Sequence, residues 1–302
     1  MSKKTAASSL AKLSSYSFRA LATRRRKLQL KKLIGIKREL GDILTTYKGL
    51  YEVTCWNDRA ELEANLNKLL ETSAETLLIA ATDESITLGK QYGIATMAYM
   101  NPDIPNQTYS GVDMIVEGME EVDANFLEKV WQRYHGIPWK IAETARCVIR
   151  ELSLDDLNEL YEIYADEEIT KFTENLYSYE EEREFQTAYI NNMYRFYGYG
   201  MWLVFDKETG ELIGRAGLEH REYHGETELE LGYVIGTKFQ RQGYATEVCR
   251  QIIEIAKVMT DFSRINCLIH AENISSIALA EKLGFAYTEE FEVDGNLMRR
   301  YI

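Results

Sequence analysis

One short stretch limits what this chain can fold into: residues 239–247, with the sequence FQRQGYATE. Residues 228–235 before it alternate as a strand does, and residues 248–256 after it have helical periodicity. A glycine turn therefore joins a strand to the N-terminus of a helix. The first N–H groups of a helix lack partners and the helix dipole adds positive potential, so this turn is suited to a phosphate or pyrophosphate. A plain connection that binds nothing is the alternative interpretation.

Length and composition exclude several classes of protein. The 302 residues, 45% of them apolar, are enough for two domains with packed cores. A net charge of −13 argues against a general nucleic-acid binder. The cysteines are far apart and form no CxxC pair, which suits reduced thiols in a cytosol, and no apolar run approaches the length of a membrane helix. We therefore expect a cytoplasmic protein.

The charge is concentrated at the N-terminus. Residues 1–40 carry twelve Lys and Arg against one acid, Glu39, so this segment is +11 and the remainder of the chain must carry −24. Loosely spaced Leu and Ile residues predict a basic helical arm over residues 1–46. Such an arm could contact RNA or the ribosome, an anionic membrane, or the acidic remainder of the chain. A solvated helix or a partly disordered arm is the simpler alternative.

The next region alternates between strands and helices. The sequence predicts helices over 57–70, 84–92 and 124–134, and strands over 77–82, 94–100 and 112–116. This alternation is typical of a parallel sheet that is covered on both faces. We expect a small doubly wound α/β domain over residues 47–141.

Part of this domain has a recognisable sequence. Residues 82–96, TDESITLGKQYGIAT, and residues 111–116, GVDMIV, resemble the last third of a haloacid-dehalogenase (HAD) fold. In that family an acidic residue after this strand helps to hold Mg²⁺, and Asp83 occupies the matching position. The DxD motif that carries the family's nucleophile has no counterpart upstream. The resemblance therefore implies a degenerate, non-catalytic HAD-like domain.

The C-terminal half has a different order of elements. We predict strands over 146–152, 202–205, 211–219, a segment ending at 235, 265–269, 285–293 and 297–301, and helices over 154–165, 178–194, 248–256 and 274–283. Asp294-Gly295 is a favourable two-residue hairpin turn between the last two strands.

This order, with residues 240–245 (QRQGYA) fitting [Q/R]-x-x-G-x-[G/A], resembles the GNAT acetyltransferase superfamily. A second motif supports the resemblance: residues 273–276 (NISS), followed by 281–285 (EKLGF), are similar to the helix after that family's fifth strand. The resemblance implies an α/β fold with a mixed sheet over residues 146–302. Within the superfamily, the ribosomal-protein-alanine acetyltransferase branch looks most similar.

The resemblance also implies a co-substrate, acetyl-CoA. Backbone N–H groups of the glycine turn would hold its pyrophosphate, and the strand edge before the turn would pair with its pantetheine arm. The Val234 N–H would donate to the thioester carbonyl, and Asn273 would fix the pantetheine near the sulfur. The residues assigned to coenzyme binding are Val234, Ile235, Gln240, Arg241, Gln242, Gly243, Tyr244, Ala245, Thr246 and Asn273.

Glu226, Glu228 and Glu230 alternate, so they share one face of a strand. In the family that face looks onto the acceptor cleft, and Glu230 is the best-placed general base. For Glu226 a solvated strand face is the preferred interpretation. Many members carry a leaving-group acid, a Tyr, where this chain has Ala280; Ser276 and Tyr233 are the candidates to replace it. Because a thiolate leaves readily near neutral pH, the missing acid need not abolish turnover.

We therefore predict an N-acetyltransferase acting on a primary amine, either a protein N-terminus or a small amine. Acids around the cleft favour a cationic acceptor. The alternatives are a non-catalytic acyl-CoA sensor or scaffold, and a ribosome- or RNA-associated factor acting through the basic arm. His220 and His224 lack a third ligand at a regular spacing, so we expect surface histidines and no metal site.

Overall fold

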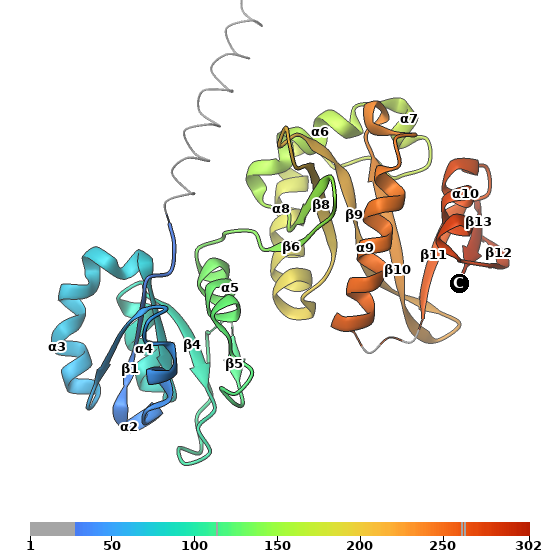
Figure 1. Ribbon diagram of the computed structural model, residues 1–302. Helices are drawn as coiled ribbons and strands as arrows, with labels where there is room; N and C mark the ends of the chain where they lie inside the picture. The colour runs from blue at the N-terminus through green and yellow to red at the C-terminus, as the bar shows by residue number, and fades with distance from the viewer. Residues whose placement is uncertain (1–27, 113, 261, 263) are drawn as a thin grey trace, which may run out of the picture. The chain divides into compact units, whose positions relative to one another are not determined.

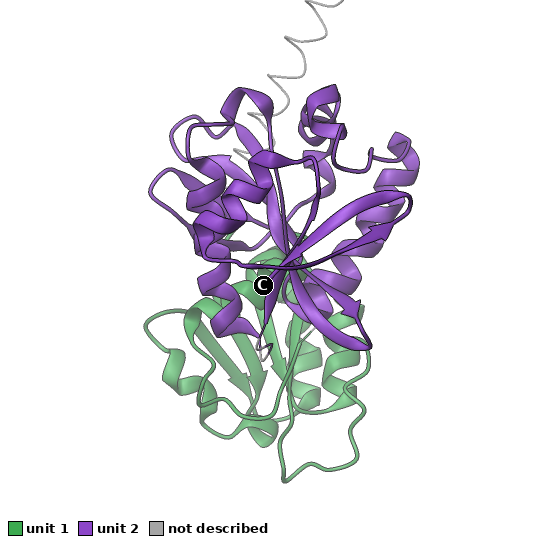
Figure 2. Ribbon diagram, turned by 90° about the vertical axis from the view of Figure 1, so that its right-hand side faces the viewer, with its two compact units in different colours: residues 1–137 green, residues 138–302 purple. Residues whose placement is uncertain are grey.

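The computed structural model describes residues 28–112, 114–260, 262 and 264–302. It divides into two compact units, Met1–Ile137 and Pro138–Ile302 (Figure 2). Residues 1–27, which carry most of the predicted basic arm and its proposed RNA contact, lie outside the described residues.

Unit 1 is built on a five-stranded sheet with the order β2-β1-β3-β4-β5, in which all strand pairs are parallel (Figure 1). Neighbouring residues of one strand enter different cores: Leu33 packs into one hydrophobic cluster and Ile34 into another. The sheet is therefore covered on both faces, as the predicted alternation requires. Its elements are β1 (Lys32–Ile36), α2 (Lys37–Leu40), η1 (Ile43–Tyr47), β2 (Glu52–Trp56), α3 (Arg59–Leu69), η2 (Leu70–Glu75), β3 (Thr76–Ala80), α4 (Asp83–Gln91), β4 (Ala95–Tyr99), β5 (Ile115–Val116) and α5 (Ala124–Tyr134).

The predicted helical arm over residues 1–46 is wrong at residues 32–36, whereas Lys37–Leu40 and Ile43–Tyr47 are short helical segments. Residues 32–36 form β1, which lies between β2 and β3, and the domain therefore begins before residue 47. Leu33, Ile34 and Ile36 are at most 2% exposed, because both faces of this strand are covered. A strand buried on both faces has a continuous apolar run rather than alternation, so the spacing of its apolar residues also fits a helical stripe.

Unit 2 contains an eight-stranded mixed sheet with the order β12-β13-β11-β10-β9-β8-β7-β6. Its strands are β6 (Lys140–Glu143), β7 (Cys147–Arg150), β8 (Met201–Asp206), β9 (Leu212–Tyr223), β10 (Glu226–Ile235), β11 (Ile265–His270), β12 (Tyr287–Val293) and β13 (Asn296–Tyr301). Only β10 and β11 pair in parallel; the other neighbours are antiparallel. The predicted mixed sheet is confirmed.

The boundary between the units differs from the prediction. Residues 140–143 form β6, which pairs with β7 at the edge of the second sheet, so residues 140 and 141 belong to unit 2 and not to the first domain. This edge strand is short and carries Lys140 and Glu143, which form an ion pair with each other. It therefore lacks the apolar alternation that marks a strand in sequence.

The helices of unit 2 lie on both faces of its sheet. On one face, Tyr189 of α8 (Tyr179–Tyr189) donates a hydrogen bond to Glu219 of β9. On the other, α9 (Tyr244–Met259) packs against β9 and β10, and α10 (Ile274–Leu283) contacts α9. The remaining helical segments are η3 (Leu154–Asp156), α6 (Leu157–Tyr164), α7 (Glu167–Thr170), the π-helix η4 (Ile190–Tyr197) that continues α8, and η5 (Thr237–Phe239).

Candidate active site

Strands β10 and β11 part after a very short parallel ladder. They pair only at Leu229 with Ile265 and at Glu230 with Asn266. Beyond this point β10 continues along β9 to Ile235, whereas β11 pairs with β13. Within the described residues, the edge of β10 that faces β11 therefore has no strand partner after Glu230. An extended ligand can pair with such an edge as an added strand.

The glycine turn lies where β10 ends and α9 begins. Gly243 caps α9 with φ 85° and ψ 0°, a left-handed conformation that favours glycine. The Gln240 amide donates to the Ile235 carbonyl at 2.9 Å, and the Gln242 amide donates to the Lys238 carbonyl at 2.7 Å, so side chains hold the turn in place. Over the described part of the chain, the backbone N–H groups of residues 242–246 meet no acceptor. The turn, called the cradle below, therefore leaves its backbone donors open to an anion, and coenzyme binding there stays a prediction.

Arg146 fastens the cradle to the sheet, a role that the sequence did not reveal. Its Nε donates to Glu247 Oε2 at 2.8 Å, and its Nη1 donates to the Gln242 carbonyl at 3.0 Å. Its guanidinium also lies 4.1 Å from the centroid of the Tyr244 ring. Because Arg146 and Glu247 are 101 positions apart, no local pattern connects them.

Glu230 lies where the strands part and is partly buried, with 15% of its side chain exposed. Its carboxylate accepts a hydrogen bond from the Tyr223 hydroxyl and lies 3.7 Å from Arg221 Nε. Burial raises the pKa of Glu230, and the Tyr223 hydrogen bond and the Arg221 charge oppose that rise. A carboxylate with a raised pKa is a better proton acceptor, which suits a general base. Tyr223 is a neighbour that sequence reasoning missed.

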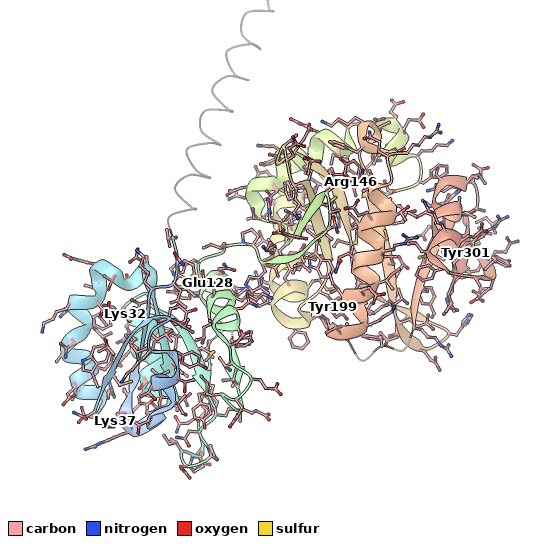
Figure 3. All side chains as sticks on the ribbon, in the orientation of Figure 1. Lys32, Lys37, Glu128, Arg146, Tyr199 and Tyr301 are labelled. Carbon is pink, nitrogen blue, oxygen red and sulfur yellow. The ribbon has the colours of Figure 1, made fainter. Side chains whose placement is uncertain are left out.

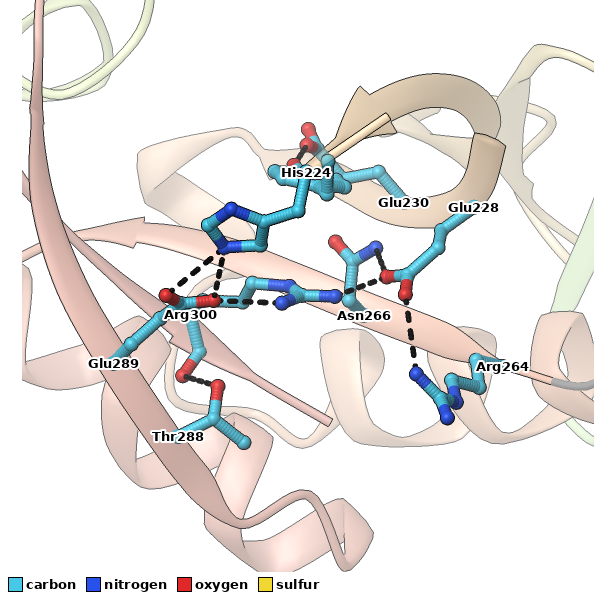
Figure 4. Close-up of polar contacts among 9 residues, drawn as sticks. His224, Glu228, Glu230, Arg264, Asn266, Thr288, Glu289 and Arg300 are labelled. Carbon is cyan, nitrogen blue, oxygen red and sulfur yellow. Dashed lines mark hydrogen bonds and ion pairs between the residues drawn. The ribbon is translucent and has the colours of Figure 1, made fainter. Parts of the chain in front are cut away.

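The Glu228 carboxylate is bonded within the protein and is not available to an acceptor amine. The prediction that it faces the acceptor cleft together with Glu230 is therefore wrong. It is 5% exposed and forms an ion pair with Arg300 of β13 (Figure 4). Asn266 Nδ2 donates to it at 2.9 Å. Arg300 in turn donates to Glu289 Oε1 at 2.7 Å, and His224 contacts the same carboxylate. This network ties β10, β11, β12 and β13 together. Glu226 is exposed, which agrees with the preferred interpretation that it lies on a solvated part of the strand.

The two candidate acids lie close together on the other face of β10. The Tyr233 hydroxyl is buried and makes no hydrogen bond of standard geometry with any described residue. Burial raises the pKa of Tyr233, and the Ser276 hydroxyl opposes that rise. Asn273 caps α10 by accepting the Ser276 N–H at 3.1 Å, which leaves its amide nitrogen for a ligand. The position of the family's tyrosine supplies no acid, because Ala280 has only a methyl group, which is buried.

The direction of the N–H groups along β10 tests whether Val234 can donate a hydrogen bond to the thioester carbonyl, as predicted. The Gly236 N–H donates to the Ile213 carbonyl of β9 at 2.9 Å, and the register of β10 with β9 is continuous from Glu226 to Ile235. Backbone N–H groups of alternate residues in a strand point to opposite neighbours. Val234 therefore turns its N–H toward β9, whereas Tyr233 and Ile235 turn theirs toward β11. The geometry favours Tyr233 or Ile235 over Val234 as the carbonyl donor.

Asp83, which matches the metal-binding acid of the HAD family, is bonded to protein groups in unit 1. The Asp83 carboxylate accepts the Thr108 N–H at 2.9 Å and the Tyr109 N–H at 2.7 Å. These hydrogen bonds lower the pKa of Asp83, with that from Thr108 the largest contribution. Among the described residues no group of three or more His, Cys, Asp and Glu side chains could hold a metal ion.

Comparison with known proteins assigns unit 2. Residues 146–286 match the family described as acetyltransferase (GNAT) domain. The second unit contains a GNAT acetyltransferase domain. The GNAT domain resembles YoaA of Bacillus subtilis (strain 168), named as an N-acetyltransferase, at 26% identity over 147 residues, 48% of this chain and 82% of YoaA. YkkB of the same organism is 32% identical over 93 residues, 31% of this chain. The matched region spans only 54% of YkkB.

A solved GNAT-family acetyltransferase from Bacillus anthracis is 23% identical, with a TM-score of 0.44, and covers 53% of this chain and 93% of its own. The predicted GNAT identity of the C-terminal half is confirmed by the family match. The HAD-like identity of unit 1 stays a prediction. Over the residues that the structure describes, no helix has the length and apolarity needed to cross a membrane.

Proposed function

We propose that the GNAT domain transfers the acetyl group of acetyl-CoA to a primary amine. One observation carries this proposal: the parting of β10 and β11 leads from Glu230 directly to the open cradle at Gly243. A pyrophosphate at the cradle would satisfy N–H groups that have no acceptor among the described residues. An extended arm along the free edge of β10 would then end beside Glu230.

The residues around the parting point divide the chemistry between them. Glu230 takes a proton from the bound ammonium, directly or through a water, and Tyr223 holds its carboxylate in place. The freed nitrogen lone pair forms the C–N bond while the C–S bond breaks and the electron pair leaves on sulfur. A backbone N–H of Tyr233 or Ile235 stabilises the charge that develops on the carbonyl oxygen. The nitrogen loses its second proton as the amide forms, and the Tyr233 or Ser276 hydroxyl can relay a proton to the thiolate, so that the products are the amide, the free thiol and a protonated Glu230.

The acceptor side favours a cationic amine. Glu219 shares the face of Glu230, because the two residues are partners across β9 and β10. Its carboxylate accepts a hydrogen bond from Tyr189 at 3.3 Å. Two carboxylates and an aromatic ring attract an ammonium group before its deprotonation. Both a protein N-terminus and a small amine meet this requirement.

The test is release of free thiol from acetyl-CoA across a panel of amines and peptides. We expect Glu230→Gln to lower kcat/KM about 100-fold to 1,000-fold with CoA affinity unchanged, because only the proton transfer is lost. Glu226→Gln removes the same charge at an exposed position of β10 and should match wild type. Since burial raises the pKa of Glu230, the acid limb of wild-type kcat/KM should lie above the ordinary glutamate range, and Glu230→Gln should lack it.

Two results would count against this mechanism. A Glu230→Gln protein as fast as wild type removes Glu230 from the reaction. Tight CoA binding without thiol release by wild type favours the alternative function, an acyl-CoA sensor. The buried Ala280 at the family's tyrosine position is the observation that supports this alternative.

For unit 1 we propose a non-catalytic HAD-like domain. The support is that two acidic side chains near the carboxyl ends of the strands are already bonded within the protein. Asp83 is held by Thr108 and Tyr109, and Glu39 by the N–H of Ala81 and the hydroxyls of Thr82 and Ser85. Neither carboxylate is left to coordinate a cation or to attack a phosphate.

A further inference from the structure

A cavity in unit 2 lies on the face of the sheet opposite Glu230. Across β9 and β10, Glu230 pairs with Glu219, so these two side chains share one face of the sheet. His220 and Glu222 are an odd number of positions from Glu219 along β9, so their side chains point to the opposite face. The cavity has a volume of about 510 Å³, within the range of about 300–1,000 Å³ typical of small-molecule sites. Its lining residues are Tyr197, Tyr199, His220, Glu222, Thr227, Met259, Thr260 and Phe262.

This cavity is separate from the coenzyme cradle. Met259 is the last residue of α9 and Thr260 its C-cap, whereas the cradle is at the first turn of the same helix. A helix of 16 residues is about 24 Å long. Figure 3 accordingly shows Arg146, which fastens the cradle, and Tyr199, which lines the cavity, toward opposite ends of the unit.

Aromatic rings form much of the cavity wall. The Tyr197 ring lies 5.8 Å from Tyr199 and 4.6 Å from the His220 imidazole, centroid to centroid, and both pairs are tilted. Phe262 adds a further ring from the segment after α9. A cation that contacts the face of one of these rings is attracted by the quadrupole of the ring.

The charges around the cavity also favour a cationic ligand. Glu222 contributes a carboxylate, and the described lining contains no lysine or arginine. The Thr227 hydroxyl donates to Glu222 and holds it at the wall. The C-terminal end of α9 adds the negative end of a helix dipole. Rings, carboxylate and dipole are independent features, and all three favour a positive ligand.

We infer that this cavity binds a small organic ammonium ion. Tyr197, Tyr199 and Phe262 would contact its alkyl groups and charge, and Glu222 would pair with it. His220 Nδ1 is buried and has no hydrogen-bond partner among the described residues, so it can meet a polar group of the ligand. The inference does not depend on acetyl transfer, because none of these residues takes part in the proposed reaction.

Choline is the probe, and its neutral carbon analogue, with a tert-butyl group in place of trimethylammonium, is the control. Choline carries no amine N–H and cannot serve as the amine acceptor, so its binding reports on this cavity without turnover. Calorimetric titration of the full chain should show saturable choline binding. The analogue should bind about tenfold more weakly, since it keeps the shape and loses the charge.

Matched variants place the site. Glu222→Gln and Tyr197→Leu should each weaken choline binding about tenfold, whereas Glu226→Gln, the same charge change on the other face of the hairpin, should not. Circular dichroism melting confirms that each variant is folded. Equal affinity for choline and its analogue, or choline binding that neither Glu222→Gln nor Tyr197→Leu weakens, overturns the inference. Binding that is lost in Glu230→Gln instead would place the cation in the acceptor cleft.

Discussion

Unit 1 and unit 2 each have a junction where a strand leads into a helix. Side chains of the protein bond to the donors of the junction in unit 1, whereas the donors of the junction in unit 2 have no acceptor among the described residues. In unit 1, β1 and β3 are neighbours at the point where the strand order reverses, the usual ligand position in an open α/β sheet. There the Glu39 carboxylate accepts the Ala81 N–H at 2.8 Å and the Thr82 hydroxyl at 2.9 Å. Asn101 Nδ2 donates to the Glu39 carbonyl at 2.7 Å. The protein's own side chains fill this edge.

In unit 2 the corresponding donors are left open. The side chains of Gln240 and Gln242 bond to carbonyls behind the turn, and Arg146 holds it from the side. None of these groups covers the N–H groups at the start of α9. We infer from this comparison that a strand–helix junction can accept an anion when its backbone donors are held rigidly and left without internal acceptors.

The largest effect is expected from closing the open junction. Gly243→Asp places a side chain at φ 85°, with its Cβ 3.5 Å from Arg146 Nη2, and adds a negative charge beside the N–H groups that would hold the pyrophosphate. We expect CoA affinity to fall about 1,000-fold, because the carboxylate both repels the phosphates and takes their donors. Equilibrium titration with CoA measures it.

Gly295→Asp is the matched control. Gly295 also has a positive φ, of 79°, and nothing lies within 4 Å of a Cβ added there. This variant carries the same backbone strain and the same added charge at the β12–β13 turn, so its CoA affinity should equal that of wild type. Intact CoA binding by Gly243→Asp would show that the cradle has been placed wrongly.

Opening the closed junction should have a smaller effect, on stability. Glu39→Gln keeps the shape of the side chain but replaces one carboxylate oxygen by an NH₂ group. That group cannot accept the hydrogen bonds that Ala81, Thr82 and Ser85 donate to Glu39, which is only 7% exposed. We expect the free energy of opening of β1 and β3 to fall by about 2–3 kcal/mol. Hydrogen exchange, followed by mass spectrometry, measures this for peptides of β1 and β3, with β10 as the internal reference.

The control for Glu39→Gln is Glu63→Gln, at an exposed position of α3. It should leave exchange unchanged, because it removes no buried acceptor. If Glu39→Gln exchanges like wild type, then the hydrogen bonds to Glu39 do not hold this edge closed, and the contrast between the two units loses its basis.

Local patterns predicted what depends on local sequence. The helices α5 and α10 begin and end where periodicity placed them, at residues 124–134 and 274–283. The cradle could also be predicted, because a glycine turn before a helix determines its own geometry. Strand β1 could not, since its two buried faces remove the alternation by which a strand is recognised.

Partners across strands could not be predicted. Alternation placed Glu228 and Glu230 on one face, but it could not show that Arg300, 72 positions later, neutralises the first. Nor could it show that Tyr223 holds the second, because that contact depends on the register of β9 with β10. The sequence therefore predicted the face of the site, and the sheet register decided which carboxylate is available.

The smallest effect, an expected absence of change, concerns metal. If the carboxylates of unit 1 are occupied as described, added Mg²⁺ has no ligand set to complete there. Millimolar Mg²⁺ should leave the melting temperature unchanged to within about 1 °C and should produce no hydrolysis of a phosphate monoester such as p-nitrophenyl phosphate. Asp83→Asn should respond to Mg²⁺ as wild type does. A Mg²⁺-dependent rise in melting temperature that Asp83→Asn abolishes would show that Thr108 and Tyr109 yield this carboxylate to a cation, and unit 1 would then have a ligand site of its own.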